Sequence, residues 1–218
     1  MNDYEDFDNY EEEKDRQRDP TVDQAIERLR GLFDSSAQRL FYSTQIETFL
    51  DLLNRIFDPE FTHAVGRHGE LMFDAALGRN GFRSEASNTK SWNGKTWQQT
   101  NHNLDRLFTR DGVAYGVEIK NTQNYIPRQE LLTKLGLCRY LGVTPLFIMR
   151  FAPKSYMHEI QQSGGFGLLF EEQIYPWGHN TLLTEVRDRL GLKVQCPRDV
   201  KEGDMQRLVK WHLKHLTL

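Results

Sequence analysis

The stretch NLDRLFTRDGVAYGVEIKN spans residues 103–121. Asp111 and Gly112 are a residue pair that tolerates the positive φ angles of a tight hairpin turn, and runs of alternating apolar and polar residues flank the pair. The stretch therefore predicts a β-hairpin whose register follows from the position of the turn. This register pairs Arg110 with Val113, Phe108 with Tyr115, Asp105 with Glu118, and Asn103 with Lys120.

Side chains alternate between the two faces of a sheet along each strand. One face of the hairpin is expected to hold Leu104, Phe108, Val113, Tyr115, Val117 and Ile119, with Arg106 as its charged residue. The other face is expected to hold Asn103, Asp105, Leu107, Thr109, Ala114, Gly116, Glu118 and Lys120. The open end of this second face therefore gathers two carboxylates, a lysine and an amide.

An aspartate directly opposite a glutamate is unfavourable in a sheet. At a separation of ~5 Å and an effective dielectric constant of ~20, the repulsion between the two charges is on the order of 3 kcal/mol. A divalent cation between the carboxylates turns this repulsion into attraction, and carboxylate oxygens are the ligands that Mg²⁺ takes. The opposed pair Asp105 and Glu118 therefore predicts a Mg²⁺ site, at which Mn²⁺ can substitute.

The arrangement resembles the core of the PD-(D/E)XK nuclease superfamily, which has the restriction-endonuclease-like fold. The family pattern is an acidic residue on one strand and acidic-x-Lys on the next, here Asp105 and Glu118-Ile119-Lys120. Many members add a glutamate on the preceding helix, and Glu70 in the segment GRHGELMFDAALG occupies that place. The chain departs from the family name at Leu104, where the pattern has proline. The resemblance covers roughly residues 66–151.

The acidic-x-Lys spacing also occurs at Glu12–Lys14 and at Asp199–Lys201, so the tripeptide alone is not specific. The copy at 118–120 differs because it lies in a predicted strand, with an upstream aspartate in register and a helix downstream. The resemblance therefore depends on the combination of the acidic-x-Lys strand, the aspartate in register and the following helix.

The resemblance implies an α/β fold with a restriction-endonuclease-like core: a central mixed β-sheet flanked by helices in αβββαβ order, with an N-terminal helical extension. It implies a metal-dependent deoxyribonuclease in which Asp105, Glu118 and the Ile119 carbonyl bind the metal. Lys120 would orient the attacking water or neutralise charge on the phosphorus, and Glu70 would position a second metal or a metal-bound water. The product would carry a 5′-phosphate. Because cutting both strands requires two sites, a homodimer is expected.

Five further residues are candidates for contacts with DNA. Gln129 or Lys134 would supply the polar residue that members of the family often place near the scissile phosphate, and the segment KLGLCRY resembles the helix of the RecB-like branch. Trp92, Lys95 and Trp97 lie among polar residues, a mixture that suits phosphate and base contacts. The alternative for the two tryptophans is a hairpin that folds them onto the core.

Two other functions are compatible with the same residues. The first is a non-catalytic DNA-binding or scaffold protein that uses a nuclease-like fold. The second is a solvated sheet face in which Lys120 and Arg106 relieve the repulsion, although the predicted register places Arg106 on the opposite face. Within the nuclease interpretation, restriction, junction-resolving and repair enzymes are not separated.

The charge of the chain is unevenly distributed. Residues 1–20 hold nine acidic and three basic side chains, and subtracting this −6 from the net charge of −3 leaves +3 for the rest of the 218 residues. A mildly basic body permits DNA binding. The tail is expected to be disordered and either simply solvated or able to shield a basic groove or recruit a protein partner.

Four segments are predicted: an acidic tail (1–20), a helical extension (21–60), the nuclease core (61–195) and a C-terminal amphipathic helix (196–218). The two cysteines, Cys138 and Cys196, exclude a disulfide framework. No apolar run approaches the length of a membrane span, and the acidic N-terminus differs from a signal peptide. A cytoplasmic protein without membrane segments is expected.

Hydrophobic spacing and turn residues predict the remaining elements. Helices are expected over 21–33, 36–57 (ended by Asp58-Pro59), 66–78, 127–141, 155–162, 181–190 and 201–218. Strands are expected within 82–100, with a turn at Asn93-Gly94, and over 145–151 and 167–175. In helix 66–78, Leu71 and Ala75 are expected to face inward, with Phe73 and Leu77 as further candidates.

Overall fold

The structure is a computed structural model that describes residues 39–216. The predicted acidic tail and the predicted helix 21–33 lie outside the described residues. The described residues form two compact units: the first contains 39–64 together with 179–192, and the second contains 65–178 and 193–216. The predicted core 61–195 thus corresponds mainly to the second unit, while its segment 179–192 lies in the first.

The first unit is helical. It contains α3 (Arg39–Ile56), the start of α4 (Pro59–Arg79) and α7 (Asn180–Leu190). An ion pair of 2.9 Å between Arg55 Nη1 and Glu185 Oε2 joins α3 to α7. Helix α4 begins seven residues earlier than predicted, because Asp58 Oδ1 accepts the Phe61 N–H at 2.9 Å and caps the new helix. The Asp-Pro pair that ends one helix therefore also starts the next.

The second unit is built on a five-stranded sheet with the order β1-β4-β5-β6-β7. Pairing is antiparallel from β1 to β5 and parallel from β5 to β7, so the sheet is mixed. The strands are β1 (Arg83–Thr89), β4 (Leu104–Arg110), β5 (Val113–Lys120), β6 (Thr144–Met149) and β7 (Phe166–Leu169). Helix α5 (Arg128–Leu141) connects β5 to β6. Apart from the small hairpin β2–β3, the elements α4, β1, β4, β5, α5 and β6 follow one another in the predicted αβββαβ order.

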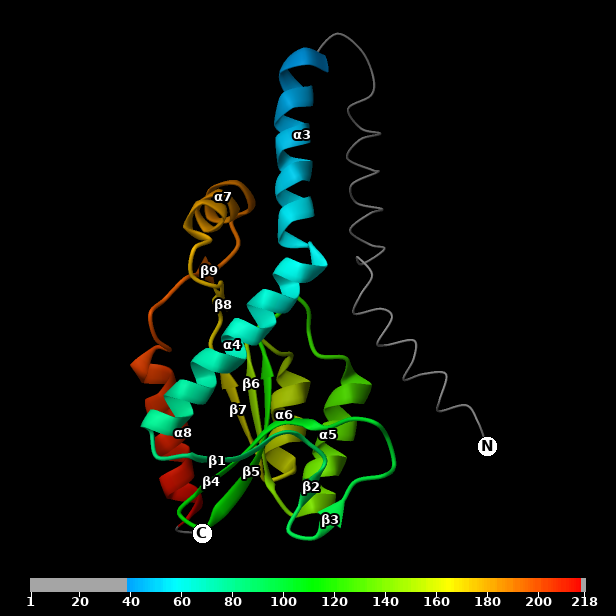
Figure 1. The fold of residues 1–218 in the computed structure, drawn as a ribbon, viewed down its shortest axis with the longest axis vertical. Coiled ribbons are helices and arrows are strands. Elements are labelled where there is room, and N and C mark those ends of the chain that lie inside the picture. Colours follow the sequence, from blue (N-terminus) through cyan, green and yellow to red (C-terminus); the bar gives the residue numbers. More distant parts are fainter. Residues whose placement is uncertain (1–38, 217–218) are drawn as a thin grey trace, which may run out of the picture. The chain divides into compact units, whose positions relative to one another are not determined.

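Helices cover both faces of this sheet (Figure 1). On one face, α4 and α8 (Glu202–His215) pack against the apolar side chains of the hairpin through Met72, Phe73, Ala76, Leu77, Met205 and Leu208. On the other face, α5 and α6 (Lys154–Gln162) pack against β6 through Leu131, Leu135 and Ile160. The α/β class with a mixed sheet between helical layers is therefore confirmed.

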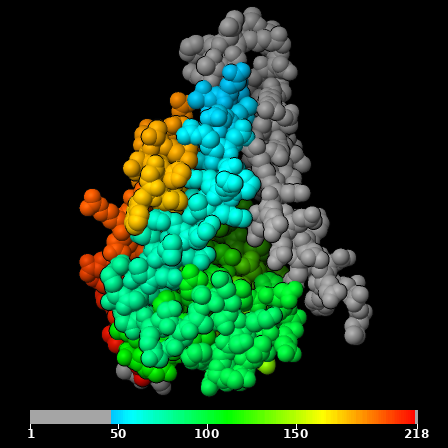
Figure 2. Space-filling view, viewed as in Figure 1, coloured from blue at the N-terminus to red at the C-terminus, as the bar shows by residue number. Residues whose placement is uncertain are grey.

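The peripheral elements agree with the predicted ones in most places. The small hairpin of β2 (Ser91–Trp92) and β3 (Lys95–Thr96) turns at Asn93-Gly94, as expected. Residues around 80–100 form much of the lower front surface in Figure 2. The strand predicted over 167–175 is instead two strands, β7 and β8 (Gln173–Ile174), because Glu171 adopts a positive φ of 63° between them. Strand β8 pairs with β9 (Val194–Gln195). No helix within residues 39–216 is long and apolar enough to cross a membrane.

The inward face of α4 differs from the predicted one. Leu71 is 59% exposed and Ala75 is also exposed, whereas Phe73 and Leu77 are buried as expected. The buried residues are Val65, Gly69, Met72, Phe73, Ala76 and Leu77. Gly69 belongs to this buried face because it lies against Asn121, just after β5, where the absence of a side chain permits close approach. Hydrophobicity alone carries no information about such a contact.

We expect the substitution Gly69→Ala to lower the free energy of unfolding by about 1–3 kcal/mol, since the added Cβ would lie 2.5 Å from Asn121 Cβ. Gly66→Ala in the same helix is the matched control: its Cβ would meet nothing within 4 Å, so the better helix propensity of alanine should raise stability by up to about 1 kcal/mol. Urea unfolding of both variants measures the difference. Equal effects at the two positions would contradict the packing described here.

Candidate functional site

The central hairpin forms as predicted along most of its length. Asp111 and Gly112 have positive φ angles of 49° and 80°, which is the turn geometry expected of this residue pair. The β4–β5 pairs run from Arg110 opposite Val113 to Arg106 opposite Val117, in the predicted register. The turn thus fixes the register over the paired length of the two strands.

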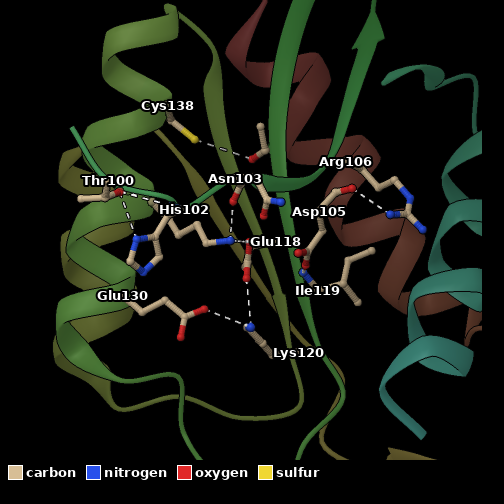
Figure 3. Close-up of polar contacts among 12 residues, drawn as sticks. Thr100, His102, Asn103, Asp105, Arg106, Glu118, Ile119, Lys120, Glu130 and Cys138 are labelled. Atoms are coloured by element: carbon tan, nitrogen blue, oxygen red, sulfur yellow. Dashed lines mark hydrogen bonds and ion pairs between the residues drawn. The ribbon is translucent and has the colours of Figure 1, made fainter. Parts of the chain in front are cut away.

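The pairing ends just before the acidic residues, and here the prediction is wrong in detail. Neither Asp105 opposite Glu118 nor Asn103 opposite Lys120 is part of the ladder. Instead, Asp105 Oδ2 accepts the Ile119 backbone N–H at 2.8 Å. The carboxylate takes the place of a strand carbonyl, so the Asp105 side chain lies between the two strands and beside Glu118 (Figure 3).

The same departure moves Leu104 to the opposite face. Leu104 was expected beside Phe108, but it packs with Leu107, Leu137 and Cys138 under α5. A Cβ on Gly116 would lie only 2.9 Å from Leu104 Cδ1, so the glycine makes room for it. Strict alternation fails because β4 is no longer held by the β5 ladder at residues 104 and 105.

Glu118 is a buried carboxylate between two ammonium groups. Glu118 is 1% exposed. Its Oε1 lies 3.1 Å from Lys120 Nζ, and its Oε2 lies 2.8 Å from Lys134 Nζ. Lys134 Nζ also donates to the Asn103 carbonyl (Figure 3). Both Glu118 oxygens are therefore buried, each against one lysine ammonium group. Lys134, a candidate phosphate contact, is thus directed at Glu118.

Glu130 is a member of the site that the sequence analysis did not identify. Its Oε1 lies 3.0 Å from Lys120 Nζ, so Lys120 is shared between two carboxylates while its side chain stays 30% exposed. Glu130 stands in the first turn of α5, four residues before Lys134. Residues at this spacing share one helix face, and a helix connecting the parallel strands β5 and β6 must cross back over the sheet. The spacing of Glu130 and Lys134 and the crossing of α5 over the sheet could together have predicted Glu130 as a site residue.

The charges of the site set its protonation. Burial, followed by repulsion from Glu118, raises the pKa of Asp105 to about 7. Burial also acts to raise the pKa of Glu118, but Lys120 and Lys134 outweigh it and hold that pKa below its usual value. Burial acts to lower the pKa of Lys120, yet the carboxylates of Glu118 and Glu130 raise it well above its usual value. Near neutral pH, Glu118 is therefore a carboxylate and Lys120 a cation.

Glu70 lies on the α4 side of the sheet and is paired there. Its Oε2 is 3.3 Å from Arg106 Nη2, and Arg106 Nε is 2.7 Å from Asp74 Oδ2. Burial raises the pKa of Glu70, with Arg106 acting in the opposite direction. Arg106 therefore faces α4, as predicted, and does not neutralise the Asp105–Glu118 pair.

The other candidate DNA contacts lie away from this pair. Trp97 is 5% exposed in the core under α5, and its indole N–H donates to Thr100 Oγ1 at 3.0 Å. Trp92 packs against the same core, so the packing alternative describes both tryptophans. Lys95 Nζ donates to the Tyr140 carbonyl at 3.2 Å, and Gln129 is exposed on α5.

A Mg²⁺ ion requires oxygen ligands such as carboxylates, backbone carbonyls and water. Within the part of the chain described, 39–216, no three His, Cys, Asp or Glu side chains are grouped as a metal site. Asp105 and Glu118 nevertheless offer two carboxylates, of which Glu118 already contacts two lysine ammonium groups. Because Lys120 O accepts the Arg150 N–H on the β6 side, the neighbouring Ile119 carbonyl is directed toward β4 and Asp105. One or two carboxylates with water and substrate oxygens is the usual Mg²⁺ environment, so these residues fit the ion.

Comparisons of the chain with protein-family models, with curated proteins and with solved structures found no match.

The raised pKa of Asp105 predicts how stability changes with pH. Between pH about 4 and about 7 the folded protein keeps a proton on Asp105 that the unfolded chain has lost, so this residue makes stability fall as pH rises through that window. A carboxyl group whose pKa rises from about 4 to about 7 on folding changes stability by at most roughly 4 kcal/mol across this window. Urea unfolding at pH 5 and pH 8 should therefore show a larger loss for the wild type than for Asp105→Asn.

Mg²⁺ provides the control for this measurement. Binding beside a charged Asp105 should recover part of the lost stability of the wild type at pH 8, and less in the variant. A pH dependence that is identical in the two proteins would contradict the assignment of the buried charge to Asp105.

Proposed function

We propose that this protein is a Mg²⁺-dependent DNA endonuclease that hydrolyses phosphodiester bonds at a PD-(D/E)XK-type site. The observation that carries the proposal is the Asp105–Glu118 pair at the end of the central hairpin, with the protonated Lys120 in contact with Glu118. The order of elements around it, from α4 through β1, β4, β5 and α5 to β6, also agrees with a restriction-endonuclease-like core.

Asp105, Glu118 and the Ile119 carbonyl would hold the metal. When bound, Mg²⁺ supplies Lewis acidity: it polarises a phosphate oxygen and lowers the pKa of a bound water. Asp105 and Glu118 contribute the negative charge that keeps the ion in place, while the Ile119 N–H orients the Asp105 carboxylate. The low exposure of Glu118 strengthens these electrostatic interactions.

Lys120 acts as a fixed positive charge in this proposal. Two carboxylates hold its ammonium, and its raised pKa makes it unsuitable as a general base at neutral pH. Its partial exposure leaves it accessible to a phosphate. The role that fits these properties is neutralisation of charge that develops on the phosphoryl oxygens.

The fit of the other proposed residues is less direct. Glu70 could position a second ion or a metal-bound water only after release from Arg106, with which it is now paired. Cleavage of both DNA strands would require two copies of the site, so the proposal includes a homodimer. It also includes a product with a 5′-phosphate, which the resemblance to the nuclease superfamily implies.

A non-catalytic DNA-binding or scaffold protein is the second candidate. The specific observation in its favour is that Lys120 and Lys134 already neutralise Glu118 without any cation. Such a protein would bind DNA with no dependence on Mg²⁺ and would cleave no substrate. A gel assay with linear, branched and methylated DNA distinguishes it from an enzyme and also separates the classes of nuclease.

The substitution Lys120→Ala tests the proposal directly. We expect it to lower the rate of DNA cleavage in Mg²⁺ by about 10²- to 10³-fold while leaving DNA binding largely intact, since the lost charge acts mainly in the transition state. Lys193→Ala removes an exposed lysine from another part of the second unit and should change neither quantity. Circular dichroism checks that both variants fold.

Unchanged cleavage by Lys120→Ala would overturn the assignment of the site. An equal loss of cleavage in Lys193→Ala would show that the effect is one of overall charge and would equally contradict a role specific to Lys120.

A further inference from the structure

Two aromatic side chains and an arginine gather at the carboxyl ends of β5 and β6. Tyr125 lies in the loop after β5, and Arg150 and Phe151 directly follow β6. Because β5 and β6 are parallel, both segments leave the sheet at the same edge. The Arg150 N–H donates to the Lys120 carbonyl at 3.1 Å. Arg150 and Phe151 therefore lie next to the end of β5, which carries Glu118 and Lys120. Open α/β sheets commonly bind ligands at this edge, where the parallel strands end.

We call Tyr125, Arg150 and Phe151 the aromatic platform. The rings of Tyr125 and Phe151 meet edge to face with centroids 4.6 Å apart. The Arg150 guanidinium carbon lies 4.2 Å from the centroid of Phe151. Tyr125 is 53% exposed, so a large part of its side chain is accessible to solvent. The platform thus combines an ordered support with an accessible aromatic surface.

Arg150 is a cation without an acidic partner. It forms no ion pair with any residue in 39–216, and its Nε is buried without a hydrogen-bond partner. Burial lowers the pKa of its guanidinium. By contrast, Arg106 and Arg128 are each paired with carboxylates. A planar cation held against an aromatic ring with no counter-charge is suited to bind a phosphate group.

We propose that the aromatic platform stacks an unpaired nucleotide next to the scissile phosphate, so that the substrate is single-stranded DNA or DNA with a single-stranded stretch at the cut. The inference rests on the nuclease function proposed above. Bases in an intact duplex are stacked on one another, so only an unpaired base offers its face to Tyr125. Arg150 would bind the phosphate of that nucleotide. A nuclease acting on frayed, flapped or branched DNA fits this chemistry better than one acting on intact duplex.

Binding experiments without cleavage test the platform. Fluorescence anisotropy in EDTA compares a short labelled single strand with the matching duplex, and we expect the single strand to bind more tightly. Tyr125→Ala should weaken single-strand binding by about 5- to 100-fold and leave duplex binding unchanged. Tyr125→Phe keeps the ring and should bind like the wild type. Tyr140→Ala is the matched control, because Tyr140 is a 44% exposed tyrosine at the other end of α5.

The salt dependence separates the roles of the two side chains. Arg150→Gln should reduce the slope of log affinity against log salt for the single strand by about 0.7, as expected for the loss of one phosphate contact. Tyr125→Ala should leave that slope unchanged, because stacking releases no counterions. A purely structural role for either residue would not lower the salt slope in Arg150→Gln while leaving it unchanged in Tyr125→Ala.

Equal affinity for duplex and single strand, or an equal loss of binding in Tyr140→Ala, would overturn the platform. The nuclease proposal fails by a different result: the wild type would cut no DNA of any form in Mg²⁺. Tyr125-dependent binding of single strands by a protein that cuts nothing would retain the platform as a binding site and reject the enzyme.

Discussion

A buried carboxylate held between two ammonium groups organises the second unit. Glu118 lies within β5 and is 1% exposed, where an unpaired charge would cost several kcal/mol. Lys120 comes from the same strand and Lys134 from α5, so the contact with Lys134 joins the strand to the helix that crosses it. Glu130 adds a second contact between α5 and the strand by binding Lys120. The placement of α5 is therefore determined by charge as well as by the apolar packing of Leu131 and Leu135.

The two acidic residues at the strand ends are in different electrostatic states. Glu118 is compensated by lysines, whereas Asp105 receives one backbone N–H and forms no ion pair with another residue in 39–216. Burial and the nearby Glu118 raise the pKa of Asp105 to about 7. Of the two, the carboxyl group without an ion-pair partner in 39–216 is thus Asp105, and it lies beside a Glu118 that is already paired with two lysines. In the proposed function, a divalent cation would compensate the charge of Asp105 and favour its carboxylate form.

Local signals in the sequence were enough to predict most of the fold. Asp111-Gly112 predicted the hairpin and its register, and Gly142 ends α5 in the left-handed conformation expected of a helix-terminating glycine. The errors arose where side chains replace backbone interactions. Alternation predicted the wrong face for Leu104, since the Asp105 carboxylate accepts the Ile119 N–H in place of a strand carbonyl.

The composition of the site was only partly predictable for a related reason. Asp105, Glu118 and Lys120 follow from the hairpin, but Glu130 depends on how α5 lies across the sheet. The burial of Trp97 depends likewise on the position of the β2–β3 hairpin against α5. Leu71 and Ala75 were misplaced because the buried face of α4 runs through Gly69, which packs against Asn121, and through Met72, Phe73, Ala76 and Leu77. Each of these is a tertiary contact between elements that are distant in sequence.

The measurement that tests metal binding most directly is the anomalous scattering of a crystal soaked in Mn²⁺. An anomalous peak should lie between the carboxylates of Asp105 and Glu118, next to the Ile119 carbonyl, with Lys134 displaced from at least one Glu118 oxygen. A soaked crystal with Mn²⁺ bound only elsewhere, and with Glu118 still held by both lysines, would contradict a metal-dependent function for this site.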